Sequence, residues 1–302
     1  MLPNFLGIGA PRSGTTWLYY NFRQHPEIWL PPVKEIHYFD ELELGPLPNL
    51  FDRIISRGNE KSIQRWKRYL KNHKNGIKKS FKTLDIPTFL WYCSYFFSLK
   101  RDIYWYKSIF RQSNNRLSGD ITPNYGHLTV ESVERVKNLM PEAKIIFLMR
   151  DPVVRAWSSV VKTIISPENI KTIDSKTEKR LINYLHLPHS IKANSYLKNI
   201  ETWKSFYPEE QVFIGFYDEI VDSPERLLKR IYDFFLGVDS SSEFIDNKKM
   251  KKKVNSYGDT KNIPKNIARN LAELHWELIE ELHNVYGGYA TCWFENAKKM
   301  LD

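Results

Sequence analysis

Cysteine is scarce in this sequence of 302 residues, since only Cys93 and Cys292 occur and no C-x-x-C spacing is present. This scarcity excludes a disulfide-built scaffold and a cysteine-bound zinc, and it favours a reducing compartment. Long apolar runs are also lacking, because no segment approaches the roughly 20 residues that cross a bilayer. We see neither a signal peptide nor a membrane anchor, and we therefore expect a cytoplasmic protein.

The residues that are present make up the composition of a globular protein with a large core. Hydrophobic residues account for 42% of the chain and charged residues for 26%, which excludes disorder, collagen and a coiled coil. There are 45 Lys and Arg against 35 Asp and Glu, so the formal net charge is +10. This excess, with aromatic residues among the Lys and Arg of residues 53–111, raises the hypothesis of a basic module that binds polyanions. No DNA- or RNA-binding motif accompanies it, so we expect no nucleic-acid partner.

Strand and helix patterns alternate along the chain. Residues 144–149 form a continuous apolar run bounded by charge, which is typical of a parallel strand covered on both faces. The alternation predicts a single α/β domain over residues 1–302, built on a mainly parallel sheet. Ser223 and Pro224 have the residue types of an N-cap and a first helical turn. Further strands are expected at 4–10 and 211–216, and helices at 16–25, from 153 onward, and at 195–206, 223–235 and 264–286.

Three segments interrupt this alternation. Residues 44–111 are rich in Lys, Arg and aromatic side chains, with helical spacing around residues 62–70. Residues 167–189 are polar, and residues 247–261 form a Lys-rich stretch that is expected to be a loop. The most apolar internal segment, residues 89–99, lies in the first of them. It is too short to span a membrane, and it predicts either core or one wall of a binding site.

The loop after the first strand has the features of an anion site. Gly9 and Gly14 are spaced as in the nucleotide-binding pattern G-x-x-x-x-G-K-[ST], but Thr15 stands where that pattern needs Lys. A cation, Arg12, lies two positions before Gly14 instead. Since a strand leads in and a helix follows, backbone N–H groups and the helix N-terminus can surround a phosphate. The hydroxyl groups of this loop belong to Ser13, Thr15 and Thr16.

Residues 9–17, Gly-Ala-Pro-Arg-Ser-Gly-Thr-Thr-Trp, resemble the 5′-phosphosulfate-binding loop of the sulfotransferases that use 3′-phosphoadenosine 5′-phosphosulfate (PAPS). That family usually has Lys where Arg12 stands. The substitution keeps the positive charge, but the hydrogen bonds come from a planar guanidinium group in place of an ammonium group. The resemblance leaves two roles for Trp17, stacking on adenine or packing in the core. The cofactor-binding residues that it implies in this loop are Pro11, Arg12, Ser13, Gly14, Thr15, Thr16 and Trp17.

A second motif lies at the next strand-to-helix junction. Residues 145–158, Ile-Ile-Phe-Leu-Met-Arg-Asp-Pro-Val-Val-Arg-Ala-Trp-Ser, resemble the 3′-phosphate motif of the same family. Arg150 and Ser158 are the positions that correspond to its phosphate ligands. An Arg at the carboxyl end of a strand offers a bidentate fork to a phosphate, and a Ser two helical turns further on can reach the same groove.

Residues 31–40, Pro-Pro-Val-Lys-Glu-Ile-His-Tyr-Phe-Asp, resemble a segment of the heparan sulfate sulfotransferase group in which the Glu is the general base. By this resemblance Glu35 takes the acceptor proton, and His37 and Asp40 shape the acceptor side. His37 is the rival base, because sulfotransferases of phenols and steroids use a His. If the segment is extended, Glu35 and His37 project to the same face.

Three more segments follow the layout of this group. Residues 119–125 resemble a stretch that lines the cleft between the two phosphate motifs, which implies a substrate contact for Tyr125. The lysine-rich residues 248–261 occupy the place of a loop that closes over the 3′-phosphate. There Tyr257 is a candidate cofactor contact, while solvated surface is the alternative. Residues 44–111 and 165–190 are then insertions on the acceptor side.

The sequence thus predicts an enzyme with a P-loop-like sulfotransferase fold that transfers a sulfuryl group from PAPS, leaving 3′-phosphoadenosine 5′-phosphate (PAP), with Arg12 at the developing charge. The resemblance implies an acceptor hydroxyl or amine on a carbohydrate, which can be anionic, and no metal. A P-loop nucleotide kinase or hydrolase is the alternative, but Thr15 contradicts it and Asp151 is its only candidate for a Mg²⁺-binding acid. The acceptor itself and the oligomeric state do not follow from the sequence.

Overall fold

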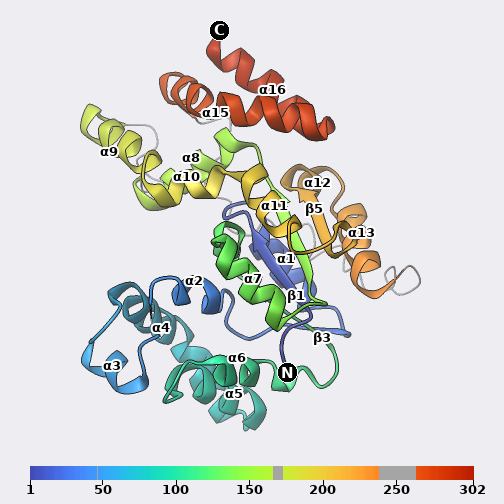
Figure 1. The fold of residues 1–302 in the computed structure, drawn as a ribbon. Coiled ribbons are helices and arrows are strands. Elements are labelled where there is room, and N and C mark those ends of the chain that lie inside the picture. Colours follow the sequence, from blue (N-terminus) through green and yellow to red (C-terminus); the bar gives the residue numbers. More distant parts are fainter. Residues whose placement is uncertain (46, 166–172, 238–262) are drawn as a thin grey trace.

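The computed structural model describes residues 1–45, 47–165, 173–237 and 263–302. Its centre is one sheet of parallel strands in the order β2-β3-β1-β4-β5 (Figure 1). The predicted α/β class with a parallel sheet is confirmed, and the strand predicted at 144–149 has the predicted bounds. The strands are β1 (Phe5–Gly9), β2 (Ile28–Trp29), β3 (Leu117–Ile121), β4 (Lys144–Met149) and β5 (Val212–Phe216).

Helices cover both faces of this sheet. Successive strand residues point to opposite sides, and apolar residues on both sides are buried under helices. Leu6, Ile145 and Phe147 pack on one face against α7, α8 and α11. Phe5 and Ile146 pack on the other face against α1 and α13. These flanking helices are α1 (Thr15–Phe22), α7 (Val130–Leu139), α8 (Pro152–Thr163), α11 (Tyr196–Lys204), α12 (Tyr217–Asp222) and α13 (Pro224–Leu236).

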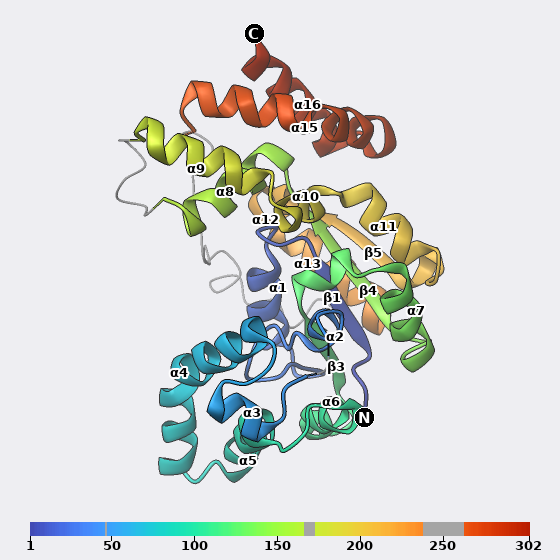
Figure 2. The same ribbon diagram turned by 60° about the vertical axis from the view of Figure 1, so that its left-hand side comes forward.

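A helical insertion lies between β2 and β3 and forms the lower part of the molecule in Figures 1 and 2. Its helices α4 and α5 run side by side, and the Trp66 indole N–H donates to the Phe96 carbonyl at 2.9 Å. This insertion matches the predicted interruption at 44–111. Its helices are α2 (Tyr38–Leu42), α3 (Leu50–Ile55), α4 (Glu60–Lys82), α5 (Ile86–Phe97) and α6 (Ile103–Ile109).

Residues 173–189 of the second interruption are largely helical, and so are residues 263–302. The helix predicted at 264–286 is confirmed as α15, which ends where Gly287 adopts φ 59°. A further helix, α16, follows at once and is absent from the sequence prediction. Ser223 stands at the N-cap of α13 but makes no side-chain capping bond, contrary to expectation. These remaining helices are α9 (Ser175–Leu185), α10 (Pro188–Asn194), α15 (Lys265–Tyr286) and α16 (Gly288–Leu301).

Three short 3₁₀ turns complete the described elements, namely η1 (Arg111–Ser113), η2 (Pro123–His127) and η4 (Glu209–Gln211). The position of β1 decides where the functional loops meet. Since β1 pairs in parallel with β3 on one side and β4 on the other, the segments that follow these three strands emerge at one edge of the sheet. In open parallel sheets this edge is where ligands bind.

Glu41, on α2, joins that helix to α4 and to the segment before α6 within the helical insertion. Its carboxylate is buried and accepts hydrogen bonds from Arg65 Nη1 at 2.6 Å and Arg101 Nη1 at 3.0 Å. The Arg101 guanidinium also lies 4.3 Å from the ring centre of Trp105. A buried ion pair of this kind contributes little net stability while it is intact, but removing one partner leaves an unpaired charge.

Glu41→Ala is therefore expected to lower the free energy of unfolding by roughly 3 to 5 kcal/mol, because Arg101 stays buried without its carboxylate. Denaturant titration followed by circular dichroism measures this loss. Glu210→Ala, at an exposed glutamate, is the matched control and should change the unfolding free energy by less than about 0.5 kcal/mol. Equal effects of the two substitutions would contradict the structural role of Glu41.

Candidate active site

The loop between β1 and α1 is shaped to leave backbone N–H groups available. Gly14 adopts φ 89°, and a Cβ there would lie 2.3 Å from Ile220 Cδ1, so only glycine fits. Arg12 also has a positive φ, at 71°. No side chain caps the N-terminus of α1, and its first N–H groups and positive dipole are therefore available to an anion.

The two predicted phosphate motifs meet at Arg12. Its Nε and Nη2 atoms donate to Ser158 Oγ on α8, at 3.1 and 2.8 Å. Residues that are 146 positions apart in the sequence are thus in direct contact. This contact fits the prediction that the loop after β1 and the junction after β4 serve one ligand.

Arg150 is held beside the same loop. Its Nη1 donates to the Arg12 carbonyl at 3.2 Å, and its guanidinium lies 4.2 Å from the ring centre of Tyr217. The Tyr196 hydroxyl donates to the Arg150 carbonyl at 2.9 Å, which fixes the backbone at the end of β4. Stacking on Tyr217 and a hydrogen bond to the backbone therefore orient the Arg150 guanidinium. No acidic side chain is among the hydrogen-bond and ion-pair partners that the structure gives for this group.

Asp151 has a structural task. Its carboxylate accepts hydrogen bonds from the backbone N–H groups of Val153 at 2.8 Å and Val154 at 3.3 Å, which caps the N-terminus of α8. Burial raises the pKa of this carboxyl to about 6. The side chain on which the kinase alternative depended is thus engaged in capping.

A cavity of about 620 Å³ lies at this edge of the sheet, and its lining combines residues of α1, α4, α8 and the predicted loops. Its charged lining is almost entirely cationic, with Glu35 as the carboxylate, and this charge suits a polyanionic ligand. Burial and the nearby Arg12 guanidinium lower the pKa of Lys162. The cations of the lining are Arg12, Arg23, Lys34, Arg150 and Lys162.

Glu35 lies at the junction of the cavity and a polar network. Its Oε1 atom pairs with Lys34, whose Nζ also donates to Thr15 Oγ1 at 3.5 Å. Glu35 and His37 have φ values of 65° and 57°, so the segment is not extended as the alternation argument assumed. The two side chains still meet, because His37 Nε2 lies 3.6 Å from Glu35 Oε2.

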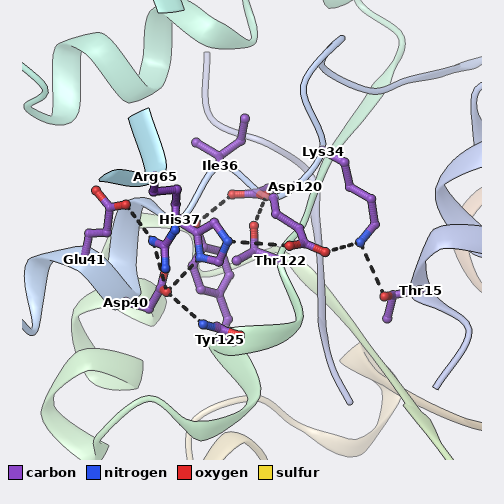
Figure 3. A network of polar contacts seen from close by, with 12 residues as sticks. Thr15, Lys34, Ile36, His37, Asp40, Glu41, Arg65, Asp120, Thr122 and Tyr125 are labelled. Atoms are coloured by element: carbon purple, nitrogen blue, oxygen red, sulfur yellow. Dashed lines mark hydrogen bonds and ion pairs between the residues drawn. The ribbon is translucent and has the colours of Figure 1, made fainter. Parts of the chain in front are cut away.

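Figure 3 shows this network as a line of contacts from Glu41 through Arg65, Asp40 and His37 toward Lys34 and Thr15. His37 Nδ1 lies 2.8 Å from Asp40 Oδ2, which also accepts from the Asn124 amide at 3.3 Å. Burial alone would lower the pKa of His37, but the carboxylates of Asp40 and Glu35 outweigh it and raise this pKa.

The same contacts lower the pKa of Glu35. Burial would raise it, but the charges of Lys34 and His37 and their hydrogen bonds more than offset that effect. Glu35 is therefore ionised and able to accept a proton. The two carboxylates favour the charged form of His37, which disfavours it as the base and favours it as the group that orients Glu35.

Tyr125 lies in the core and not in the cavity. Its side chain is fully buried, its hydroxyl donates to Asp120 Oδ2 at 2.9 Å and accepts from the Tyr38 backbone N–H at 2.9 Å. The cavity is lined instead by its neighbours Pro123 and Asn124. This hydroxyl positions the segment that carries His37, so the structure places Tyr125 beneath the cavity lining, and the substrate contact expected of it stays a prediction.

Some of the other predicted residues line the cavity, and others lie behind its lining. Trp17 both lines the cavity and packs in the core with Leu18 and Phe22, so its two expected roles are compatible. Ser13, Ser158 and His37 are buried behind the lining, and Asp40, whose side chain is 12% exposed, does not line the cavity either. Tyr257 and residues 248–261 lie outside the described residues. The predicted residues that line the cavity are Pro11, Arg12, Gly14, Thr15, Thr16, Trp17, Glu35 and Arg150.

Sequence reasoning missed several lining residues. Lys34 is adjacent to Glu35 within residues 31–40, so its place in that motif could have predicted that it lines the cavity. Tyr69, Asn72 and His73 come from α4, where no motif exists and only the fold brings the helix to the cavity. Arg23 directly follows α1 and Lys162 stands on α8, the helices that follow the two phosphate motifs, and spacing from those motifs was the signal available for both.

Among the residues that the structure describes, no cluster of three or more His, Cys, Asp or Glu side chains is suited to a metal ion. Nor is any described helix both long and apolar enough to cross a membrane.

Similar proteins include human heparan sulfate glucosamine 3-O-sulfotransferase 3B1, which is 28% identical over 140 residues, covering 45% of this chain and 36% of that protein. The membrane-associated sulfotransferase kil1 of Dictyostelium discoideum is 24% identical over 264 residues, covering 77% of this chain and 56% of that protein. The chain thus spans between about a third and about a half of the length of the curated relatives it matches.

Solved structures share the fold. A sulfotransferase from Alicyclobacillus acidocaldarius superposes with a TM-score of 0.63 at 19% identity, covering 97% of this chain and 99% of that one. Mouse sulfotransferase SULT7A1 complexed with PAP gives a TM-score of 0.50 at 15% identity, covering 98% and 89%. The sheet, its flanking helices and the P-loop-like edge are therefore those of the sulfotransferase fold. Residues 3–241, most of the chain, match the sequence model of the sulfotransferase family, and the chain belongs to that family.

Proposed function

We propose that this sulfotransferase moves the sulfuryl group of PAPS to a hydroxyl or amine of a carbohydrate acceptor, with Glu35 as general base. One observation carries the proposal: the cationic anion-binding loop, Arg150 and the Glu35 carboxylate line the same cavity. A cationic wall is suited to a doubly phosphorylated nucleotide. A single carboxylate among these cations is suited to removing a proton from a neutral acceptor.

The donor side rests on residues that fit the two ends of PAPS. The α1 N-terminus, Arg12 and Thr15 would hold the 5′-phosphosulfate, and Arg150 the 3′-phosphate, with Ser158 behind Arg12. The bound donor supplies a sulfuryl group whose S–O bond to the 5′-phosphate breaks. PAP bound to the mouse relative, whose fold this chain shares, agrees with such a donor.

The acceptor side rests on Glu35. Its carboxylate would take the proton as the acceptor oxygen or nitrogen bonds to sulfur, and the electron pair of the broken S–O bond passes to the leaving phosphate. Arg12 and Lys34 would stabilise the charge that develops there. Positioning and charge stabilisation supply most of the catalysis in transfers of this kind.

The carbohydrate class rests on the relatives. The human and mouse proteins that match are described as heparan sulfate glucosamine 3-O-sulfotransferases. Their matched region covers 45% of this chain. In this chain, α4 contributes Tyr69, Asn72 and His73 to the cavity. Aromatic and amide side chains on this wall are able to contact a sugar ring and its hydroxyls.

Calorimetric titration tests the donor site. PAP should bind more tightly than 5′-AMP or ATP–Mg²⁺, and Arg150→Ala should weaken PAP binding roughly ten- to hundredfold, because a charge-assisted contact is lost. Arg226→Ala, at an exposed arginine of α13, is the control and should bind PAP as the unaltered protein does. A preference for ATP–Mg²⁺ would overturn the donor assignment.

Glu35→Gln tests the base. Sulfuryl transfer from radiolabelled PAPS to an acceptor found by screening oligosaccharides should fall roughly 10²- to 10⁴-fold, because the amide cannot take the proton. PAP affinity should stay within a few-fold, since the donor contacts remain. Glu210→Gln is the exposed control. Unchanged turnover in Glu35→Gln would show that another group takes the acceptor proton, and would overturn the assignment of Glu35 as the base.

His37→Gln tests the orienting role through pH. Because the folded protein raises the pKa of His37, the charged histidine stabilises the fold below its unfolded pKa, near 6.5, and this contribution disappears as pH rises through the folded pKa. The unfolding free energies of the two proteins should therefore differ most near pH 6 and converge as the solution becomes alkaline, as denaturant titrations at several pH values would show. A difference that grows with pH would contradict the charge assignment.

A further inference from the structure

Helix α5 exposes an apolar stripe to solvent. The segment Ile86–Phe97 carries no charged residue, and its Trp91, Tyr92, Tyr95 and Phe96 fill the core on one side. On the other side Ile86, Leu90 and Phe97 are 48%, 55% and 46% exposed. The spacing of four and seven residues puts these three on one helix face. The sequence suggested core or a binding-site wall for this segment, but no α5 residue lines the cavity.

Neighbouring segments extend the stripe at both ends. Phe81 and Leu84, at the connection from α4, are 62% and 76% exposed. At the other end Leu99 is 75% exposed, and its carbonyl accepts from the Leu50 N–H at 3.0 Å, which places α3 beside it. Phe51, on α3, is 67% exposed. Exposed apolar side chains gathered in this way mark an interaction surface.

Helix α4 adds a row of lysines beside this stripe. Nine Lys and Arg side chains stand on α4 against one Glu. Lys67, Lys71, Lys74 and Lys78 follow the spacing of one helix face, and Phe81 continues it. Because the Phe81 ring contacts the Phe89 ring of α5 at 5.4 Å between centres, this face of α4 lies toward the outer side of α5.

We propose that this surface, formed by the apolar stripe of α5 with its extensions and the lysine row of α4, docks on an anionic lipid membrane. Apolar side chains enter the headgroup boundary and lysines pair with acidic headgroups, which is the combination that interfacial helices use. A second copy of the chain fits less well, since it would bring two lysine rows together. A free polyanion would use the lysines but not the exposed rings.

Docking there would hold the cavity close to the membrane. Tyr69, Asn72 and His73, on another flank of α4, line the cavity, so one helix belongs to both surfaces. The enzyme would then meet acceptors carried on lipids or on membrane proteins at short range, which raises their effective concentration.

Vesicle co-sedimentation of the full chain tests the proposal. The protein should sediment with vesicles of phosphatidylcholine plus phosphatidylserine, much less with phosphatidylcholine alone, and less as salt rises. The apolar variant Leu90→Ser/Phe97→Ser and the charge variant Lys71→Glu/Lys74→Glu/Lys78→Glu should each weaken binding roughly tenfold or more. Lys298→Glu/Lys299→Glu, at exposed lysines of α16, should bind like the unaltered protein.

PAP titration of the same variants separates docking from folding, since all of them should bind PAP normally. Three results would overturn the proposal. One is vesicle binding that neither variant changes. The second is a dimer, seen by light scattering, that Leu90→Ser/Phe97→Ser dissociates while no vesicle binding is found. The third is heparin binding that only the charge variant loses, without vesicle binding, which would assign the lysines to a polyanion.

Discussion

The parallel pairing of β1 with β3 and β4 is the constraint on which every functional contact depends. It brings the loop after β1, the junction after β4 and the segment after β3 to one edge of the sheet. Arg12 can therefore reach Ser158, and the Tyr125 hydroxyl can hold the backbone of the segment that carries Glu35 and His37. Without that edge, three stretches far apart in the sequence would share no cavity.

Charge is distributed unevenly over this edge, and the imbalance gives each polar residue its task. Cations line the cavity, so the one carboxylate of the lining, Glu35, stays ionised beside Lys34. Asp40 and Glu35 favour the charged form of His37, and Asp40 in turn faces Arg65. The alternation of sign along this line favours the charged form of each group and fixes its position, which is what a preorganised site requires.

The strands and the anion-binding loop could be predicted from the sequence because local patterns determine them. Residues 145–149 are apolar throughout, between Lys144 and Arg150, and Gly14 needs a conformation that only glycine adopts at ease. Tyr125 could not be placed, because a tyrosine beside a site and one beneath it have the same local sequence. The turns at Glu35 and His37 were missed for a similar reason, since left-handed backbone at such residues is imposed by tertiary contacts. The helix α16 was missed because it follows α15 after only a glycine turn, and Gly287 and Gly288 are typical of the end of a helix.

The helical insertion separates two requirements that an enzyme of this kind must meet. In the function proposed above, the donor would be held by elements that belong to the sheet and its first helix, whereas one wall of the cavity comes from α4, which is inserted between β2 and β3. Substitutions along α4 can therefore alter which molecules enter without disturbing the packing of β1, β3 and β4. Such a division lets acceptor preference diverge quickly between related enzymes while the chemistry at the sheet edge stays the same.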